Sequence, residues 1–205
     1  MRSGLVDLSQ ADLTGVDLRN LNFNDAWFWR AKLRSAKLQG ASFQASRFSF
    51  ADLKYAGLAD ASLQGAWFYD AQLQEAVLME AKLQGAVLEH ADLRGAYLAE
   101  ADLHEAVLKG AQLQGADFVS FPTGERAEPT KRLTVEQLAE AMIDDSTRLP
   151  EQLHKALQGA AHQRPGAHAG STSLADGTRN MVAKQADGLL QEASKEGDKP
   201  SEEAN

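Results

Sequence analysis

The amino-acid sequence predicts an all-β solenoid, and three observations carry that prediction. Residues 6–120 divide into 23 consecutive five-residue units without an insertion. The third residue of every unit is Leu or Phe, and the first is Ala in 19 of the 23 units. Phe residues at the third position recur at twenty-residue intervals, as Phe28, Phe48 and Phe68 do. Self-similarity at a fixed period is the signature of a repeat architecture.

The five-residue period fits neither a continuous helix nor a continuous strand. Five residues advance an α-helix by about 500°, so successive Leu side chains would not form one stripe. In a strand, an odd period would send the Leu of each following unit to the opposite face. The chain must therefore turn within every unit, with positions one and three inside and positions two, four and five outside.

The Phe spacing predicts the size of one coil. If four units make one circuit, Phe28, Phe48 and Phe68 stack inside one wall, and Phe23 stacks with Phe43. The 23 units then form about six coils, spaced by about 4.8 Å. Leu and Phe fill the axis, Ala lets the corners close, and Gly at position five suits turns that need an unusual φ.

The A(D/N)LXX pattern of these units resembles the motif of the pentapeptide-repeat proteins over residues 6–120. The resemblance implies a right-handed quadrilateral parallel β-helix, which we expect for residues 1–120. It also raises a function, because some members of that family resemble DNA in shape and charge and protect DNA gyrase against quinolones.

The remainder of the chain is expected to cap the solenoid. Residues 121–132 are rich in Pro, Gly and charge and read as a linker. Residues 133–158 predict two short helices, the first with a capping box of Thr134 and Gln137, the second starting near Pro150. This segment resembles the LTxEQLxxAxxDxxTxLP stretch that follows the repeats in many bacterial pentapeptide proteins. Residues 159–205 are expected to be mostly flexible, with one further helix at about 178–193.

The first coil departs from the pattern, with Val6, Val16 and Leu21 where Ala is expected. Only five residues precede it, too few for a helical cap, although solenoid ends need covering. We expect this end either to stack on a second copy, giving a homodimer, or to follow upstream chain. In the second case the sequence would be the soluble part of a membrane-attached protein.

One wall carries an unusual set of outward side chains. Trp27, Arg47 and Trp67 fall in one column, which predicts a guanidinium between two indoles. This column could be a stabilising ladder, a surface covered by the chain's own tail, or a binding face of the kind that Trp, Tyr and Arg anchor. The candidate protein-binding residues are Trp27, Trp29, Arg47, Trp67, Tyr69, Val87 and Val107.

DNA mimicry would need acidic columns along a wall. The best candidate column is Asp60, Glu80 and Glu100. Against it, Lys32, Arg34, Lys54 and Arg94 share a wall that is closer to basic. The resemblance adds that gyrase-protecting members carry loops projecting from the coils, and the uninterrupted units leave no room for one.

The sequence contains no catalytic signature. It lacks Cys, nucleophile-elbow, phosphate-loop and zinc-protease motifs, and its five His residues are scattered. We therefore expect no enzyme, no cofactor and no metal site. The formal net charge of −8, spread along the chain, argues against direct nucleic-acid binding. No apolar run is long enough to span a membrane and no signal peptide is present, so we expect a cytoplasmic protein.

The function that the sequence favours is a rigid, non-catalytic scaffold that binds an unidentified protein through the aromatic wall. The alternatives are the gyrase-directed DNA mimic and the soluble part of a membrane-attached protein.

Overall fold

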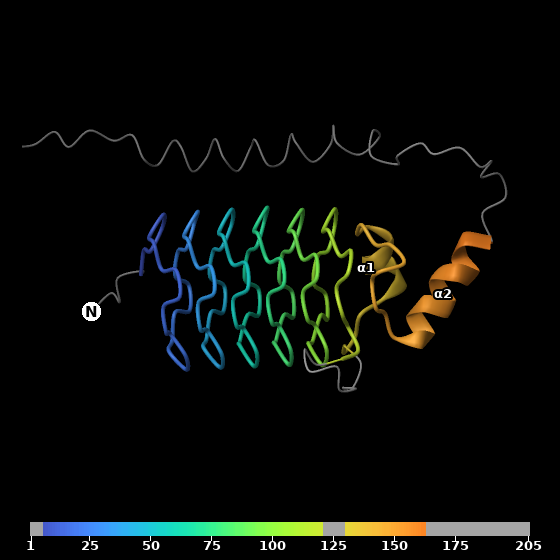
Figure 1. The fold of residues 1–205 in the computed structure, drawn as a ribbon, viewed down its shortest axis with the longest axis horizontal. Coiled ribbons are helices and arrows are strands. Elements are labelled where there is room, and N and C mark those ends of the chain that lie inside the picture. The colour runs from blue at the N-terminus through green and yellow to red at the C-terminus, as the bar shows by residue number, and fades with distance from the viewer. Residues whose placement is uncertain (1–5, 121–129, 163–205) are drawn as a thin grey trace, which may run out of the picture. The chain divides into compact units, whose positions relative to one another are not determined.

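The computed structural model describes residues 6–120 and 130–162, and for 158–162 it describes the backbone alone. Residues 6–120 form stacked coils (Figure 1). Every β-bridge within the repeat is parallel and joins residues twenty apart, as Trp27 joins Asp7 and Arg47. The twenty-residue circuit predicted from the Phe spacing is confirmed.

The four walls are named here by their bridging columns. The first wall carries Trp27, the second Lys32, the third Lys37 and the fourth Ser42. Within the described residues each wall contributes one bridging residue per coil, and no longer strand forms. The reason is the period itself, because a two-residue turn at positions four and five follows each bridge directly.

The inward side chains form one continuous core. From Ala26 to Phe118, every residue at positions one and three is at most 4% exposed. Phe48 stacks nearly parallel on Phe28 and on Phe68, with ring centroids 4.7 and 5.0 Å apart. Phe23 and Phe43 form a second stack at 5.7 Å. The Phe columns are therefore core packing, as the sequence predicted.

Position five has a left-handed backbone at every corner except the last, Ser120, and not only where Gly stands. From Gln10 to Gly115 these residues have φ between 52° and 71°. Bulky residues such as Phe50 (φ 62°) and Tyr55 (φ 62°) adopt it too, although this costs an L-residue about 1–2 kcal/mol. The ladder holds them there, because the position-five N–H donates to the next coil, as Phe50 N–H does to Tyr69 O at 2.9 Å.

Acidic and amide side chains at position two stabilise the turns. In the first coil, Asp7, Asp12, Asp17 and Asn22 each accept a hydrogen bond from the backbone N–H two residues later. This Asx-turn contact is the local reason that Asp and Asn suit position two.

The C-terminal end is closed by a segment outside the repeat. Lys131, Met142 and Arg148 bridge to Asp102, Gln112 and Asp117 and so continue three of the walls. Helix α1 (Val135–Ala139) takes the place of the remaining wall, the first, and there the Gln137 side-chain amide donates to Leu103 O and Ala106 O. The predicted capping box of Thr134 and Gln137 is present.

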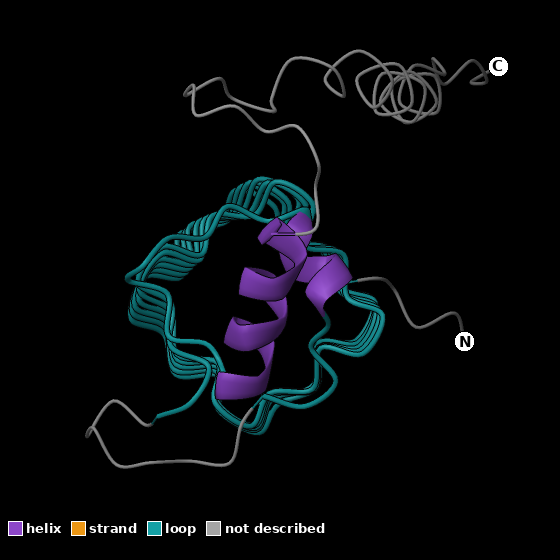
Figure 2. Ribbon diagram, turned by 90° about the vertical axis from the view of Figure 1, so that its right-hand side faces the viewer, coloured by secondary structure: helices purple, strands orange, loops and turns teal. Residues whose placement is uncertain are grey.

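Helix α2 (Glu151–His162) lies across the end of the coils (Figure 2) and extends beyond the expected boundary at 158. Its Leu153 and Leu157 pack against the core, which Leu138 also closes. Pairing with the last coil starts inside the expected linker, because Thr130 Oγ1 donates to Leu98 O. Residues 121–129 and the predicted helix at 178–193 lie outside the described residues.

Candidate protein-binding wall

The outward column of the first wall is assembled as predicted. Bridges connect Trp27, Arg47, Trp67, Val87 and Val107 in that order. Trp27, Trp67 and Val107 are 38%, 47% and 39% exposed, which is unusual for large apolar side chains. The wall therefore offers apolar surface over several coils.

The predicted sandwich of Arg47 between two indoles is half wrong. The Arg47 guanidinium lies over Trp27, 4.8 Å from the ring centroid. Among the described aromatic contacts there is none between Arg47 and the Trp67 ring. The ladder fixes where the Cα atoms lie, but rotamers decide which ring a guanidinium meets.

The structure adds three residues that sequence reasoning missed. Arg30, Phe50 and His90 occupy position five on the corner between the first and second walls. The Arg30 guanidinium lies 4.4 Å from the Trp29 ring and 5.7 Å from the Phe50 ring. The signal that could have found them is the twenty-residue spacing of position five, which places Arg30, Phe50 and His90 in one column.

Aromatic contacts continue along that corner. Phe50 and Tyr69 meet edge to face at 5.8 Å, and Tyr69 meets His90 at the same distance. The aromatic surface therefore turns the corner. The name aromatic wall is used below for the seven predicted residues together with Arg30, Phe50 and His90.

The C-terminal part of the aromatic wall is polar. Glu89 lies 3.8 Å from both Lys109 and His90. Burial, with a contribution from Glu89, raises the pKa of Asp70, although His90 opposes the shift. Burial, followed by the nearby carboxylates of Asp70 and Glu89, raises the pKa of Tyr69. Tyr69 therefore stays protonated at neutral pH and keeps its hydroxyl as a donor.

Arg30 and Arg47, unlike the cations near Glu89, have no carboxylate partner among the described residues. Both lie on aromatic rings, and neither forms an ion pair with a carboxylate of the described residues. A stacked guanidinium still presents N–H donors at its edge. The two arginines can therefore receive carboxylates from another molecule.

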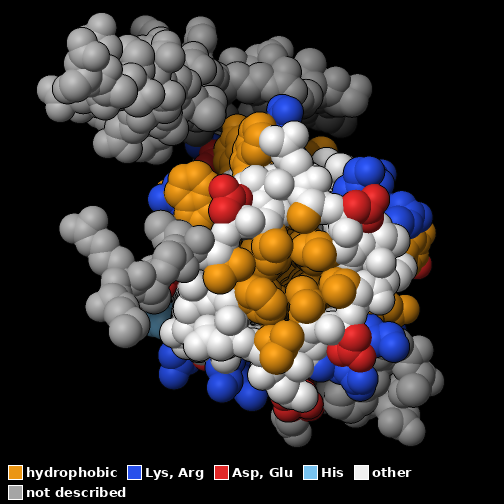
Figure 3. Space-filling view, turned by 90° about the vertical axis from the view of Figure 1, so that its left-hand side faces the viewer, with side chains coloured by type: hydrophobic (Ala, Val, Ile, Leu, Met, Phe, Trp, Pro, Cys, Tyr) orange, Lys and Arg blue, Asp and Glu red, His pale blue; other side chains and the backbone are white. Residues whose placement is uncertain are grey.

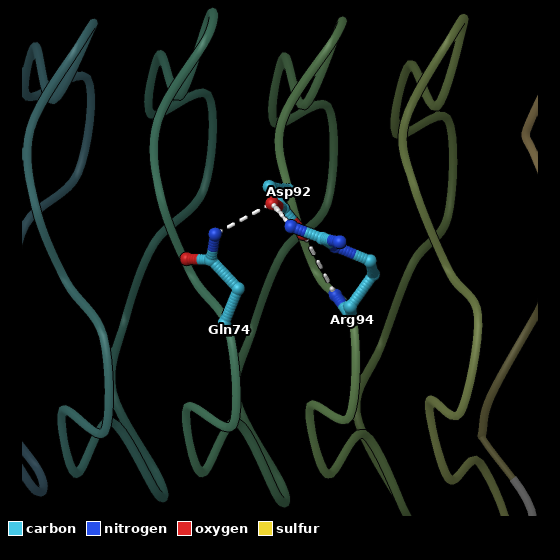
Figure 4. A network of polar contacts seen from close by, with 3 residues as sticks. All are labelled: Gln74, Asp92 and Arg94. Carbon is cyan, nitrogen blue, oxygen red and sulfur yellow. Dashed lines mark hydrogen bonds and ion pairs between the residues drawn. The ribbon is translucent and has the colours of Figure 1, made fainter.

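The candidate acidic residues Asp60, Glu80 and Glu100 occupy successive corners of the third wall, where backbone hydrogen bonds hold adjacent coils together. The predicted basic residues lie on the second wall. There Arg94 pairs with Asp92 at 2.6 Å, and Gln74 donates to the same carboxylate (Figure 4). Burial opposes ionisation of Asp92, yet the hydrogen bonds from Arg94 and Gln74 hold its pKa below the usual range. Part of the basic charge is therefore neutralised locally.

The described residues contain neither a metal-binding cluster nor a membrane-spanning helix. No three His, Asp or Glu side chains within 6–120 and 130–162 are grouped so that they could hold a metal ion. No helix in the same ranges is both long and apolar enough to cross a membrane.

A stack of four-walled coils built from five-residue units defines a class of solenoid protein. Comparison with known proteins identifies the family within that class. The family model for pentapeptide repeats matches in 8 copies over 6–34, 28–58, 58–95 and 81–119. The chain belongs to the pentapeptide-repeat family. Such proteins are generally non-catalytic scaffolds. No curated protein sequence matches the chain.

Several solved structures are similar. HetL from the cyanobacterium Nostoc sp. strain PCC 7120, involved in heterocyst differentiation regulation, is 32% identical over 60% of this chain, with a TM-score of 0.56. The match spans only 52% of HetL. Rfr23 from Cyanothece 51142 is 24% identical over 70% of this chain and 91% of its own, with a TM-score of 0.51.

QnrB1, a plasmid-mediated fluoroquinolone resistance protein, is 19% identical over 80% of this chain and 86% of its own, with a TM-score of 0.59. At such identities Rfr23 and QnrB1 show the fold alone. Together these structures imply a right-handed quadrilateral β-helix, consistent with the bridges described above.

Proposed function

We propose that this protein is a non-catalytic scaffold that binds a partner protein through the aromatic wall. The observation that carries the proposal is the combination of exposed Trp27 and Trp67 with Arg30 and Arg47, which lie on rings without a carboxylate partner among the described residues. Trp, Tyr and Arg dominate the binding energy of protein interfaces. The surface suits a partner with aliphatic side chains and one or two carboxylates.

The rigid core supports the same proposal. The residues behind the wall, such as Phe28, Phe48 and Phe68, are fully buried and stacked. A surface on such a support loses little conformational entropy on binding. Outward side chains of this wall can also be replaced without disturbing the core beneath them.

The test is affinity capture from a cell extract, followed by mass spectrometry. Trp27→Ala with Trp67→Ala should remove the captured partner while the circular dichroism spectrum and thermal midpoint change little. Tyr55→Ala is the matched control, because Tyr55 is 45% exposed but lies between the second and third walls. The proposal is wrong if capture survives the double Trp variant or if Tyr55→Ala abolishes it equally.

The DNA-mimic alternative has less support. The likeness to QnrB1 is one of fold. The acidic corners lie between the third and fourth walls, whereas the second wall, on the other side of the third, carries Lys32, Arg34 and Arg94. A supercoiling assay with purified gyrase checks it, and unchanged supercoiling in excess protein would exclude it.

The homodimer formed by end stacking would use the exposed face of the first coil. Looking onto the first coil, Figure 3 shows an apolar disc, but the first three bridging positions around it are Asp7, Asp12 and Asp17. In the rod these acids lie beneath Trp27, Lys32 and Lys37, and Asp12 pairs with Lys32 at 3.4 Å. Arg19 pairs with Asp17 at 2.6 Å, so two of the three acids already have a cation partner, and end stacking stays a prediction.

Two further expectations stay predictions. The idea that the C-terminal tail covers the aromatic wall concerns residues outside the described ranges. The idea of a membrane-attached protein is tested by neither the structure nor the comparisons.

A further inference from the structure

The third wall is a second apolar surface, on the opposite side of the coils from the aromatic wall. In three consecutive coils its units read AGLAD, AVLME and AYLAE. Bridges stack Gly57, Val77 and Tyr97 in one column. Met79 follows two residues after Val77 in the same coil, also on the outward side, and Val77, Met79 and Tyr97 are half-buried. These three units contain no Lys, Arg or His.

Acidic side chains border this apolar stripe on both sides. Asp60, Glu80 and Glu100 form the corner towards the fourth wall, and Glu75 stands on the corner towards the second wall. Within the described residues, Asp60 and Glu80 form no ion pair. A ligand for this wall therefore needs an apolar stripe with cations at its borders.

The spacing of the coils favours a helical ligand over an extended one. Successive acids repeat with the coils, about every 4.8 Å. A helix lying along the rod presents one side chain per turn about every 5.4 Å, so its positions i, i+3 or i+4, and i+7 follow three coils. In an extended peptide, side chains on one face repeat about every 6.6 Å, so by the third coil they no longer align with the acidic side chains of the wall.

We propose that the third wall binds a cationic amphipathic α-helix of a partner protein, with its apolar side on Val77, Met79 and Tyr97 and its Lys or Arg residues facing Asp60 and Glu80. Because the first and third walls are opposite sides of a four-walled coil, the scaffold can hold two partners at once. This inference does not depend on what binds the aromatic wall.

The test uses a fluorescein-labelled synthetic peptide of Leu and Lys in an amphipathic helical pattern, with a Leu and Glu peptide of the same pattern as counterpart. Fluorescence anisotropy is recorded with the full chain at about 0.15 M salt, where the Debye length is about 8 Å. The cationic peptide should bind and the anionic peptide should not.

The decisive variant is Val77→Lys with Met79→Lys, which places two cations on the stripe. Lys stands naturally at the same two unit positions elsewhere, as Lys32 and Lys54 do, so the coil accepts it. The matched control is Ser62→Lys with Gln64→Lys, which adds the same charge to the fourth wall. The first variant should weaken binding by at least about tenfold, whereas the control should change it by about twofold or less.

A second variant, Asp60→Asn with Glu80→Gln, removes charge and keeps shape, and it should weaken binding and flatten its salt dependence. The proposal is overturned if the cationic peptide does not bind, if the anionic peptide binds equally, or if both Lys variants weaken binding alike. It is also overturned if Trp27→Ala with Trp67→Ala abolishes peptide binding. If the aromatic wall captured no partner protein, the proposed function would fail, but binding of the cationic peptide to the third wall would be unaffected.

Discussion

The two ends of the rod are built from the same five-residue unit but are closed differently. At the C-terminal end, Leu113 and Phe118 are fully buried beneath residues 130–157. At the N-terminal end, the inward Leu8, Leu13 and Leu18 are only partly buried, and Val6 and Leu21 are 43% and 48% exposed. Each coil buries the coil below it and leaves its own outer face open. A repeat therefore cannot close itself, and closure needs residues outside the repeat.

The largest difference should appear when the same residue type is removed from the middle and from the open end. Phe48→Ala, in the fully buried stack, should lower the free energy of unfolding by about 3–5 kcal/mol. Phe23→Ala, in the half-buried first coil, should cost less than half as much, because part of its surface already meets water. Urea unfolding followed by circular dichroism measures both. Equal losses would mean that the first coil is as well packed as the middle.

The capped end should depend on one helix residue. Leu138 is 1% exposed at the end of the core, so Leu138→Ala should cost about 2–4 kcal/mol. Hydrogen exchange of amides in residues 101–118 should accelerate more than exchange in the middle coils, because solenoid units are stabilised by their neighbours. Met142, which is 52% exposed, supplies the control: Met142→Ala should leave both measurements nearly unchanged. Uniform acceleration along the rod would contradict a local cap.

Corner glycines offer a smaller and more local comparison. Gly15 and Gly85 have φ of 67° and 64°, and an added Cβ would meet nothing within 4 Å at either position. Replacing Gly85 by Ala should therefore cost about 1 kcal/mol through backbone strain alone. The strain at Gly15→Ala is similar, but it should appear as faster exchange in the first coil with little change in the global unfolding midpoint. A matching fall in the midpoint would show that the first coil unfolds together with the rest.

The smallest expected effect is on the loss of folding stability at low pH. Hydrogen bonds from Arg19 lower the pKa of Asp17 to about 2. Burial raises the pKa of Asp92, but the hydrogen bonds from Arg94 and Gln74 outweigh burial and lower it. A depressed folded-state pKa contributes stability above the unfolded value of about 3.9, and this is lost as pH falls through the folded value. Asp92→Asn should therefore reduce the loss of stability between about pH 4 and pH 2. Asp17→Asn should change it little, because Asp17 is exposed and its ion pair is screened. Thermal unfolding midpoints of the two variants, measured between about pH 4 and pH 2, test this difference. An equal change in both variants would contradict it.

The sequence alone determined the architecture of residues 6–120. A uniform five-residue unit leaves one way to bury every Leu and Phe, and the spacing of Phe28, Phe48 and Phe68 specifies four units per coil. It also placed Trp27, Arg47 and Trp67 in one column, because positions on the ladder follow from counting.

Tertiary structure decided everything that depends on side-chain direction or on residues outside the period. It placed Arg47 on one indole instead of two, joined Arg30, Phe50 and His90 to the aromatic wall, and brought Lys131, Met142 and Arg148 onto the last coil. It also turned three ordinary units of the third wall into a continuous apolar stripe with acidic borders. The physical reason is that a repeat fixes backbone positions by its period, whereas rotamers and long-range pairing depend on neighbours that are distant in the sequence.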